Sequence, residues 1–390
     1  MSDQVRTVTS VSWLGRIQRS VGGVLFGVVL VLAMVGGLFW NEGRAVQTEK
    51  ALAEGAGAVV SVAADRIDPA QDGRLVHVSG PVTTAETLSD PEFGISAQGV
   101  RLVRKVEMFQ WVESESSKTE TRLGGGEETV TTYTYKKEWH EGAVDSSDFQ
   151  EASGHENPEP ALSSQAFQVE DARLGAFALT DSILADIGNA EPLKISADQK
   201  DAILAASSLG KKISIRDGVI QAGLNPGSPE VGDLRISYEL VPLGDVSIVA
   251  AQEGDSFAPY QTQAGDALQL VDVGSHDAAQ MFKTAGDENN LITWLLRIGG
   301  LVLLVVGFML ITGPLGVLAD VLPFLGSLVR LGTGLVALVL GLGIGTLTIA
   351  LAWFWYRPLL SVIILAVGAL VVGGIVYLAR NRKPAAPAAA

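Results

Sequence analysis

Four long apolar stretches punctuate the chain and predict membrane-spanning helices. The first, residues 21–40, contains no charged residue, and three more lie near 294–318, 331–355 and 359–379. Twenty helical residues extend about 30 Å, the thickness of the hydrocarbon core of a bilayer. We therefore expect a multi-pass α-helical membrane protein with four spans, the last three forming a transmembrane bundle over 294–379.

The first stretch is interpreted as an uncleaved signal anchor. The apolar region of a cleavable signal peptide is usually about 7–15 residues long, which is shorter than residues 21–40. Arg16 and Arg19 precede the stretch, and Phe39 and Trp40 close it where aromatic residues meet the membrane boundary.

Basic residues at the two ends of the chain predict the orientation. They are Arg6, Arg16 and Arg19 before the first span and Arg380, Arg382 and Lys383 after the last. Positive charge marks the cytoplasmic side. We therefore expect a cytoplasmic N-terminus over 1–20, a basic, Ala-rich cytoplasmic tail over 380–390, and residues 41–293 outside the cytoplasm. That domain is periplasmic in a bacterial inner membrane and lumenal in a eukaryotic cell.

The region between the first two spans alternates apolar and polar residues, which is typical of strands. A strand over 100–112 is expected to pair with 128–140 through a turn at Gly124–Gly126. Shorter strands are expected at 74–78, 234–240, 245–252 and 266–273. The prediction is an α+β extracytoplasmic domain dominated by antiparallel strands.

Fewer segments of the domain have helical composition. Residues 43–57 are expected to continue the first span, and further helices are expected at 171–187, 197–209 and 275–286. Ser196 and Ser275 are plausible N-caps.

Aromatic residues gather on the predicted strand pair. They are candidates for cross-strand contacts, either in the core or on a binding surface: Phe109, Trp111, Tyr133, Tyr135 and Trp139.

Small residues recur at helical spacing in the spans and are candidates for close helix packing, within one chain or between chains. They are Gly23, Gly27, Ala337, Gly341, Gly345, Ala369 and Gly373.

Charge and composition exclude several classes of protein. Residues 41–293 carry a net charge of −22, which disfavours nucleic acid because affinity for phosphates comes mainly from Lys and Arg. The chain has no cysteine, so disulfides, thiolate metal sites and a thiol nucleophile are absent.

The sequence contains no recognisable catalytic motif. The four histidines, His77, His140, His155 and His276, share no metal-ligand spacing. No phosphate-binding glycine loop precedes a helix, and no nucleophile elbow occurs. We expect no metal, no cofactor and no enzymatic activity, with a membrane-tethered enzyme as an alternative.

Motifs along most of the chain carry a resemblance to a known family. They include Asn41-Glu42-Gly43-Arg44 after the first span, Gly73–Val78, Val106–Glu113, Glu230–Arg235 and Tyr356-Arg357-Pro358. In this order, with four spans, the chain resembles the transmembrane protein 43 (LUMA) family from about residue 20 to 380. The Ala-rich tail and the lack of cysteine suggest a bacterial member.

The resemblance implies a structural role in membranes. Animal members reside in the endoplasmic reticulum and inner nuclear membrane, self-associate, and bind emerin and lamins. We expect a membrane scaffold that self-associates within the lipid bilayer, with its other protein partners unknown. An oligomeric channel or a lipid-handling protein is the first alternative. A candidate junction between membrane and domain comprises Asn41, Glu42, Gly43, Arg44, Tyr356, Arg357 and Pro358.

Overall fold

The computed structural model describes residues 3–370 apart from 211, 226, 360, 364–365 and 367–369. The chain divides into two compact units. The helical unit comprises Val11–Lys50, Thr121–Glu127 and Gly286–Ala390, and the strand-rich unit comprises Met1–Ser10, Ala51–Glu120 and Glu128–Ala285.

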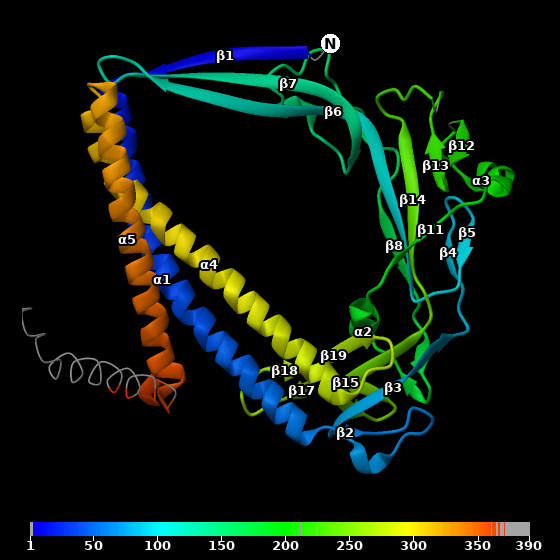
Figure 1. Ribbon diagram of the computed structural model, residues 1–390. Coiled ribbons are helices and arrows are strands. Elements are labelled where there is room, and N and C mark those ends of the chain that lie inside the picture. The colour runs from blue at the N-terminus through cyan, green and yellow to red at the C-terminus, as the bar shows by residue number, and fades with distance from the viewer. Residues whose placement is uncertain are drawn as a thin grey trace, which may run out of the picture. The chain divides into compact units, whose positions relative to one another are not determined.

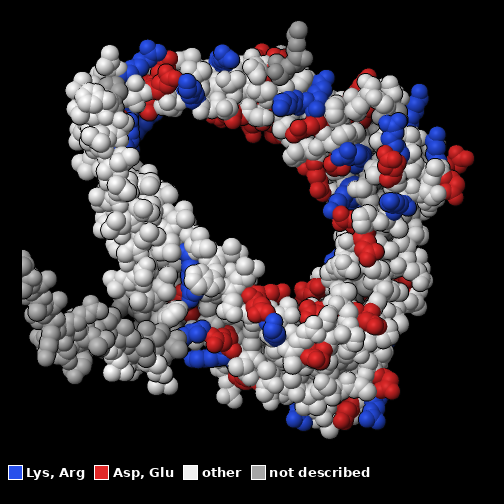
Figure 2. Space-filling view, viewed as in Figure 1, with Lys and Arg blue, Asp and Glu red and all other residues white. Residues whose placement is uncertain are grey.

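Three long helices contain the first three predicted spans, and they pack alongside one another (Figure 1). They are α1 (Trp13–Ala58), α4 (Ala278–Ala319) and α5 (Pro323–Tyr356). Each is long and apolar enough to cross a membrane. Most of their apolar side chains are exposed, and Figure 2 shows the resulting long uncharged surface along the helices. Such a surface requires lipid or another apolar partner.

The helices extend beyond the predicted spans. Helix α1 continues through residues 43–57, as expected. The helix expected at 275–286 is fused to the second span in α4. It begins at Ala278, after Asp277 accepts a hydrogen bond from the backbone N–H of Gln280. Asp277 is therefore the N-cap, and the assignment of Ser275 was wrong.

The structure also changes the end of the predicted bundle. Only residues 320–322 connect α4 to α5, where the sequence predicted a loop over 319–330. The fourth predicted span, 359–379, lies largely outside the described residues, so four spans remain a prediction.

The strand-rich unit contains an eight-stranded sheet in which β6 and β7 are neighbours, which confirms the predicted pairing of 100–112 with 128–140. The order is β1-β7-β6-β14-β13-β12, with β8 on β6 and β11 on β14. The strands are β1 (Asp3–Val11), β6 (Arg101–Thr121), β7 (Glu127–Glu141), β8 (Gln165–Gln168), β11 (Glu191–Leu193), β12 (Ile213–Arg216), β13 (Val219–Ala222) and β14 (Leu234–Val241).

A second, seven-stranded sheet is built around β3 (Leu75–Thr84) and β15 (Asp245–Glu253), which pair antiparallel from Leu75↔Ala251 to Pro81↔Asp245. It is completed by β2 (Val60–Ser61), β9 (Ala172–Leu174), β10 (Phe177–Ala178), β16 (Ser256–Ala258) and β19 (Leu270–Val273). Two small pairs are β4 (Leu88–Asp90) with β5 (Ile95–Ala97) and β17 (Tyr260–Gln261) with β18 (Ala267–Leu268).

The core follows from the period-two pattern of β6. Leu102, Val106 and Met108 are at most 5% exposed, whereas Arg101 and Glu107 on the opposite face are partly exposed. Strand β14 pairs with this segment from Met108↔Leu234 to Arg101↔Val241. Alternate residues of both strands therefore face one apolar core.

A polar triad is buried in this core. Arg104 donates to both carboxylate oxygens of Asp90 at 2.8 Å, and the Tyr238 hydroxyl donates to Asp90 Oδ2 at 2.6 Å. Burial, followed by the bond to Asp90, raises the pKa of Tyr238 above its usual range. The triad joins the β4–β5 pair to β6 and β14, and Arg104 uses its remaining donors on the carbonyl of Ser163 and on Gln165 Oε1, so the buried charge is fully hydrogen-bonded.

Short helices are present in the strand-rich unit. The segment expected as a helix at 171–187 instead contains β9, β10 and then α2 (Asp181–Asp186), so helical composition was overridden there by sheet pairing. The segment at 197–209 is η3 (Ala197–Gln199) followed by α3 (Lys200–Ala206). Ser196 is the N-cap of η3, as predicted, and it forms a capping box with Gln199. The remaining 3-10 turns are η1 (Pro69–Gln71) and η2 (Ser146–Asp148).

The N-terminal segment departs from the expected topology. Residues 3–11, assigned from charge to a cytoplasmic tail, form β1 at the sheet edge beside β7. Hydrogen-bonded strands lie on the same side of a membrane. The pairing therefore does not fit the assignment of 1–20 and the whole of 41–293 to opposite sides.

Candidate functional site

A buried carboxylate joins α1, α4 and α5. Glu42 of α1 is 2% exposed. Arg297 of α4 binds it through two bonds, Nε to Oε1 at 2.6 Å and Nη2 to Oε2 at 2.7 Å, and the indole N–H of Trp353 of α5 donates to Oε2 at 2.8 Å. A two-pronged arginine–carboxylate pair has restricted geometry, so this site sets how the helices meet.

Aromatic rings complete the site. The guanidinium carbon of Arg297 lies 4.9 Å from the ring centre of Trp294 and 5.7 Å from that of Trp353. Cation–π contacts of this kind gain strength when water is excluded. The charge of Arg297 is therefore balanced by a carboxylate and two rings.

A second layer of polar contacts lies beside this pair, between α1 and α4. Asn41 Nδ2 donates to the carbonyl of Thr293 at 3.2 Å, and Arg44 donates to Asn289 Oδ1 and Thr293 Oγ1, both at 2.9 Å. Asn289 Nδ2 returns a bond to the carbonyl of Ala45 at 3.0 Å. Spacings of three and four residues place these groups on facing sides of the two helices.

The structure brings most of the predicted junction together. A Cβ atom on Gly43 would lie 2.6 Å from Tyr356 Cζ, so glycine is required for α1 to pack against this ring. The ring of Phe39 lies 5.3 Å from that of Tyr356. Arg357 forms an ion pair with Glu49. Pro358 follows at the start of the next helical residues.

The predicted small residues differ in what they contact. A Cβ on Gly27 would lie 2.7 Å from the carbonyl oxygen of Gly307, and one on Gly341 would lie 2.6 Å from Val305 Cγ2. Gly345 is similarly close to Leu301, and Ala337 is fully buried. A Cβ on Gly23 would meet no atom within 4 Å. Ala369 and Gly373 lie outside the described residues.

A second buried carboxylate lies at the opposite end of the helices. Asp320, between α4 and α5, is 0% exposed, and its Oδ2 contacts Arg16 Nη2 at 2.7 Å and Arg330 Nη1 at 2.5 Å. Arg16 also donates to the carbonyl of Gly125 at 2.7 Å. The turn between β6 and β7 is thus attached to the Arg16 end of the helices, which also does not fit a single side for all of 41–293.

The two charged ends lie one bilayer apart. Helix α1 has no charged residue between Arg19 and Glu42, and α4 has none between Arg297 and Asp320. Each interval holds 22 residues, or about 33 Å of helix, which matches the hydrocarbon thickness. The two ion clusters are therefore separated by the length of uncharged helix that a bilayer requires.

The aromatic residues predicted on the strand pair are mostly packed. The Phe109 and Trp139 rings lie 5.4 Å apart, and His155 lies between Tyr135, stacked at 4.0 Å, and Trp111, edge-on at 4.6 Å. Tyr135 is 1% exposed. These four aromatic residues act in the packing of the β6–β7 ribbon, and Tyr133 is partly buried on it.

The Tyr135 hydroxyl is held on both sides. It donates to Glu113 Oε2 at 2.7 Å and accepts from the backbone N–H of Glu151 at 2.9 Å. Burial, with the bond to Glu113, raises the pKa of Tyr135 to about 12.

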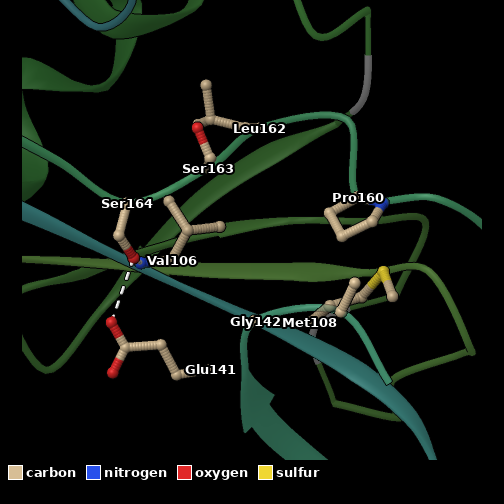
Figure 3. Close-up of a pocket in the computed structure, with 9 residues that line it drawn as sticks. Val106, Met108, Glu141, Gly142, Pro160, Leu162, Ser163 and Ser164 are labelled. Atoms are coloured by element: carbon tan, nitrogen blue, oxygen red, sulfur yellow. Dashed lines mark hydrogen bonds between the residues drawn. The ribbon is translucent and has the colours of Figure 1, made fainter. Parts of the chain in front are cut away.

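An open pocket of about 510 Å³ lies beside β6 in the strand-rich unit. Figure 3 shows Val106, Met108, Pro160 and Leu162 around it, with Ser164 Oγ donating to Glu141 Oε1 at 3.1 Å. Its wall is mainly apolar, and no titratable pair converges on it.

Metal-ligating side chains do not cluster within the described part of the chain: no group of three His, Cys, Asp or Glu could hold a metal ion. The histidines form ordinary structural contacts, such as His77 Nε2 with the carbonyl of His276 at 2.9 Å.

Sequence reasoning missed the residues of α4 and α5 that complete the polar site. Asn289, Thr293 and Arg297 recur every four residues and thus share one face of α4. This spacing on α4, together with the three-residue spacing of Asn41 and Arg44 on α1, is a sequence signal that indicates two polar helix faces in contact. Asp320 carried no comparable signal, because its partners come from distant segments.

The fold and the site define the class: an integral membrane protein with long apolar helices joined by buried ion pairs and a strand-rich domain. The family model for transmembrane protein 43 matches residues 108–358. The chain belongs to the transmembrane protein 43 family.

Individual relatives support this assignment. The chain is 33% identical to Transmembrane protein 43 of Homo sapiens over 395 residues, covering 98% of this chain and 95% of the relative. Transmembrane protein 43 of Rattus norvegicus is 34% identical over 95% of this chain and 93% of the relative. The Drosophila melanogaster homolog is 32% identical over 73% of this chain and 74% of the relative. No solved structure matches this chain.

Proposed function

We propose that this protein is a structural membrane scaffold that self-associates and organises membrane complexes. The observation that carries the proposal is the attachment of the helices to one another at both membrane boundaries, by Glu42–Arg297–Trp353 and by Arg16–Asp320–Arg330. Buried ion pairs resist separation, because removing one partner leaves an uncompensated charge. Helices held in a fixed arrangement in this way are suited to a structural scaffold.

Self-association is supported by small residues that face away from the bundle. A Cβ atom on Gly332, Gly334 or Gly343 of α5 would meet no atom of the described residues within 4 Å. Outward-facing glycines allow the helix of a second copy to approach closely.

The test uses the natural absence of cysteine. Gly334→Cys is predicted to form a disulfide-linked dimer in native membranes under mild oxidation. Ala337→Cys, three residues further on the same helix but fully buried, is the matched control and should remain monomeric. Monomer alone for Gly334→Cys, and a single-chain mass in native mass spectrometry, would refute self-association through α5.

The side of the membrane is a further part of the proposal. Arg16 and Arg19 flank one end of α1, and the tail carries Arg380, Arg382 and Lys383, so we assign the Arg16–Asp320 end to the cytoplasm and the Glu42–Arg297 end to the outside. The assignment covers the two ends of the helices.

A further inference from the structure

The helical unit contains an open groove that none of the packing described above uses. It has a volume of about 290 Å³ and lies between α1 and α4. Its walls include Met34, Gly37 and Leu38 on one helix and Leu296 and Gly299 on the other, and Asn41 stands at one end. The groove thus begins in the apolar span and reaches the polar layer at the boundary.

Glycine creates the open space. A Cβ on Gly37 or on Gly299 would meet no atom within 4 Å, whereas one on the neighbouring Gly300 would lie 2.6 Å from Leu38 Cδ2. Gly300 therefore lets the helices approach, and Gly37 and Gly299 leave the groove unfilled. From Met34 to Asn41 the groove follows α1 for about 10 Å.

The polar end of the groove leads to a cation without a carboxylate partner. Arg44 follows Gly37 and Asn41 on the same face of α1. It donates only to neutral oxygens, on Asn289, Thr293 and Asn41, and its Nε is buried without a hydrogen bond. Arg44 forms no ion pair within the described residues, and the nearby carboxylate of Glu42 pairs with Arg297 instead.

We propose that this groove binds an anionic phospholipid, with part of one acyl chain between α1 and α4 and the phosphate group near Arg44. The apolar walls match an acyl chain, and the unneutralised guanidinium matches a phosphate, which arginine binds through charge-assisted hydrogen bonds. The site lies at the boundary where phospholipid head groups are found. A helix from a second copy has a diameter of about 10–12 Å, which a groove of about 290 Å³ does not accommodate.

The test is native mass spectrometry of the full-length protein, purified in mild detergent and incubated with an equal mixture of phosphatidylglycerol and phosphatidylcholine. The wild-type chain is predicted to retain phosphatidylglycerol over phosphatidylcholine by about tenfold, which corresponds to ~1.4 kcal/mol. Arg44→Gln removes the charge and should abolish the preference. Gly37→Leu combined with Gly299→Leu adds side chains at two positions where a Cβ atom has open space, so it should fill the groove and abolish retention of the lipid.

The matched control is Gly22→Leu combined with Gly23→Leu, which adds the same bulk at two open positions of α1 at the other end of the span. It should retain the lipid as the wild type does. Unchanged retention in the groove-filling variant, or an unchanged preference in Arg44→Gln, would overturn the proposal. Loss of oligomers with unchanged lipid in the groove-filling variant would also overturn it, because the groove would then hold a second copy. If the protein is monomeric but shows the predicted lipid pattern, the lipid proposal is supported and only the proposed self-association is refuted.

Discussion

Removing the charge of Glu42 is expected to destabilise the helical unit more than any other single change at the junction. Glu42 and Arg297 are 2% and 13% exposed, and two bonds of 2.6 and 2.7 Å join them. Glu42→Gln leaves Arg297 charged and unbalanced, and loss of one partner of a buried pair costs about 3–5 kcal/mol. The bond from Trp353 is retained by the glutamine oxygen, so the effect reports the ion pair.

The assay is a double-mutant cycle on unfolding in mild detergent. Arg297→Met keeps most of the apolar stem, and the double variant leaves neither charge unpaired. We expect a coupling free energy of about 2 kcal/mol between the two substitutions. Glu49→Gln is the control, because Glu49 also pairs with an arginine but is 59% exposed, and such pairs contribute about 0–1 kcal/mol. If Glu42→Gln costs no more than Glu49→Gln, and the double variant shows no coupling, the pair does not hold the helices together.

The remaining predictions concern the other boundary, the helix contacts and the domain. Asp320→Asn removes the carboxylate shared by Arg16 and Arg330 and leaves Glu127, 3.3 Å from Arg16 Nε, as the remaining anion beside them. It should cost about 3 kcal/mol in the same unfolding assay, and wild-type stability would contradict the role of this cluster. Gly307→Leu should destabilise the helical unit by about 1–3 kcal/mol, because a Cβ atom there would lie 2.7 Å from Val31 Cγ2. Gly313→Leu should be neutral, because a Cβ atom there would meet no described atom within 4 Å. Equal effects of the two variants on thermal unfolding would refute close packing of α1 on α4. The raised pKa of Tyr135, about 12, favours the folded state while the hydroxyl is protonated, so its contribution is complete below the unfolded pKa of about 10 and is lost as pH rises through about 12. Tyr135→Phe should therefore reduce the loss of stability between pH 10 and 12, measured by circular dichroism, and an unaltered pH profile would contradict the buried hydroxyl.

The apolar patterns were sufficient to predict the three described spans, because a helix in lipid must be apolar over the whole bilayer thickness. The β6–β7 pair and the burial of Leu102, Val106 and Met108 also followed from local alternation. Such features depend on neighbouring residues and are therefore visible in one sequence.

Features that join distant segments were missed. Asp320 pairs with Arg16, which in turn donates to the carbonyl of Gly125. Chain folding brings these three segments together, so no local sequence pattern predicts the contacts. The segment 171–187 has helical composition, but Ala172–Leu174 is recruited by β3, which illustrates how tertiary pairing overrides propensity. Strand β1 was treated as a charged flank, because its pairing with β7 depends on a segment more than a hundred residues away.

The central claim is that α4 and α5 cross the membrane, with the Glu42–Arg297 and Arg16–Asp320 clusters at its two faces. Asn290 and Ser327 are exposed positions near opposite clusters, and the chain contains no cysteine. Single variants Asn290→Cys and Ser327→Cys would be treated with a membrane-impermeant maleimide in sealed vesicles of known orientation. The account predicts labelling of Asn290→Cys only from the extracytoplasmic face and of Ser327→Cys only from the cytoplasmic face. Labelling of both from the same face would contradict it.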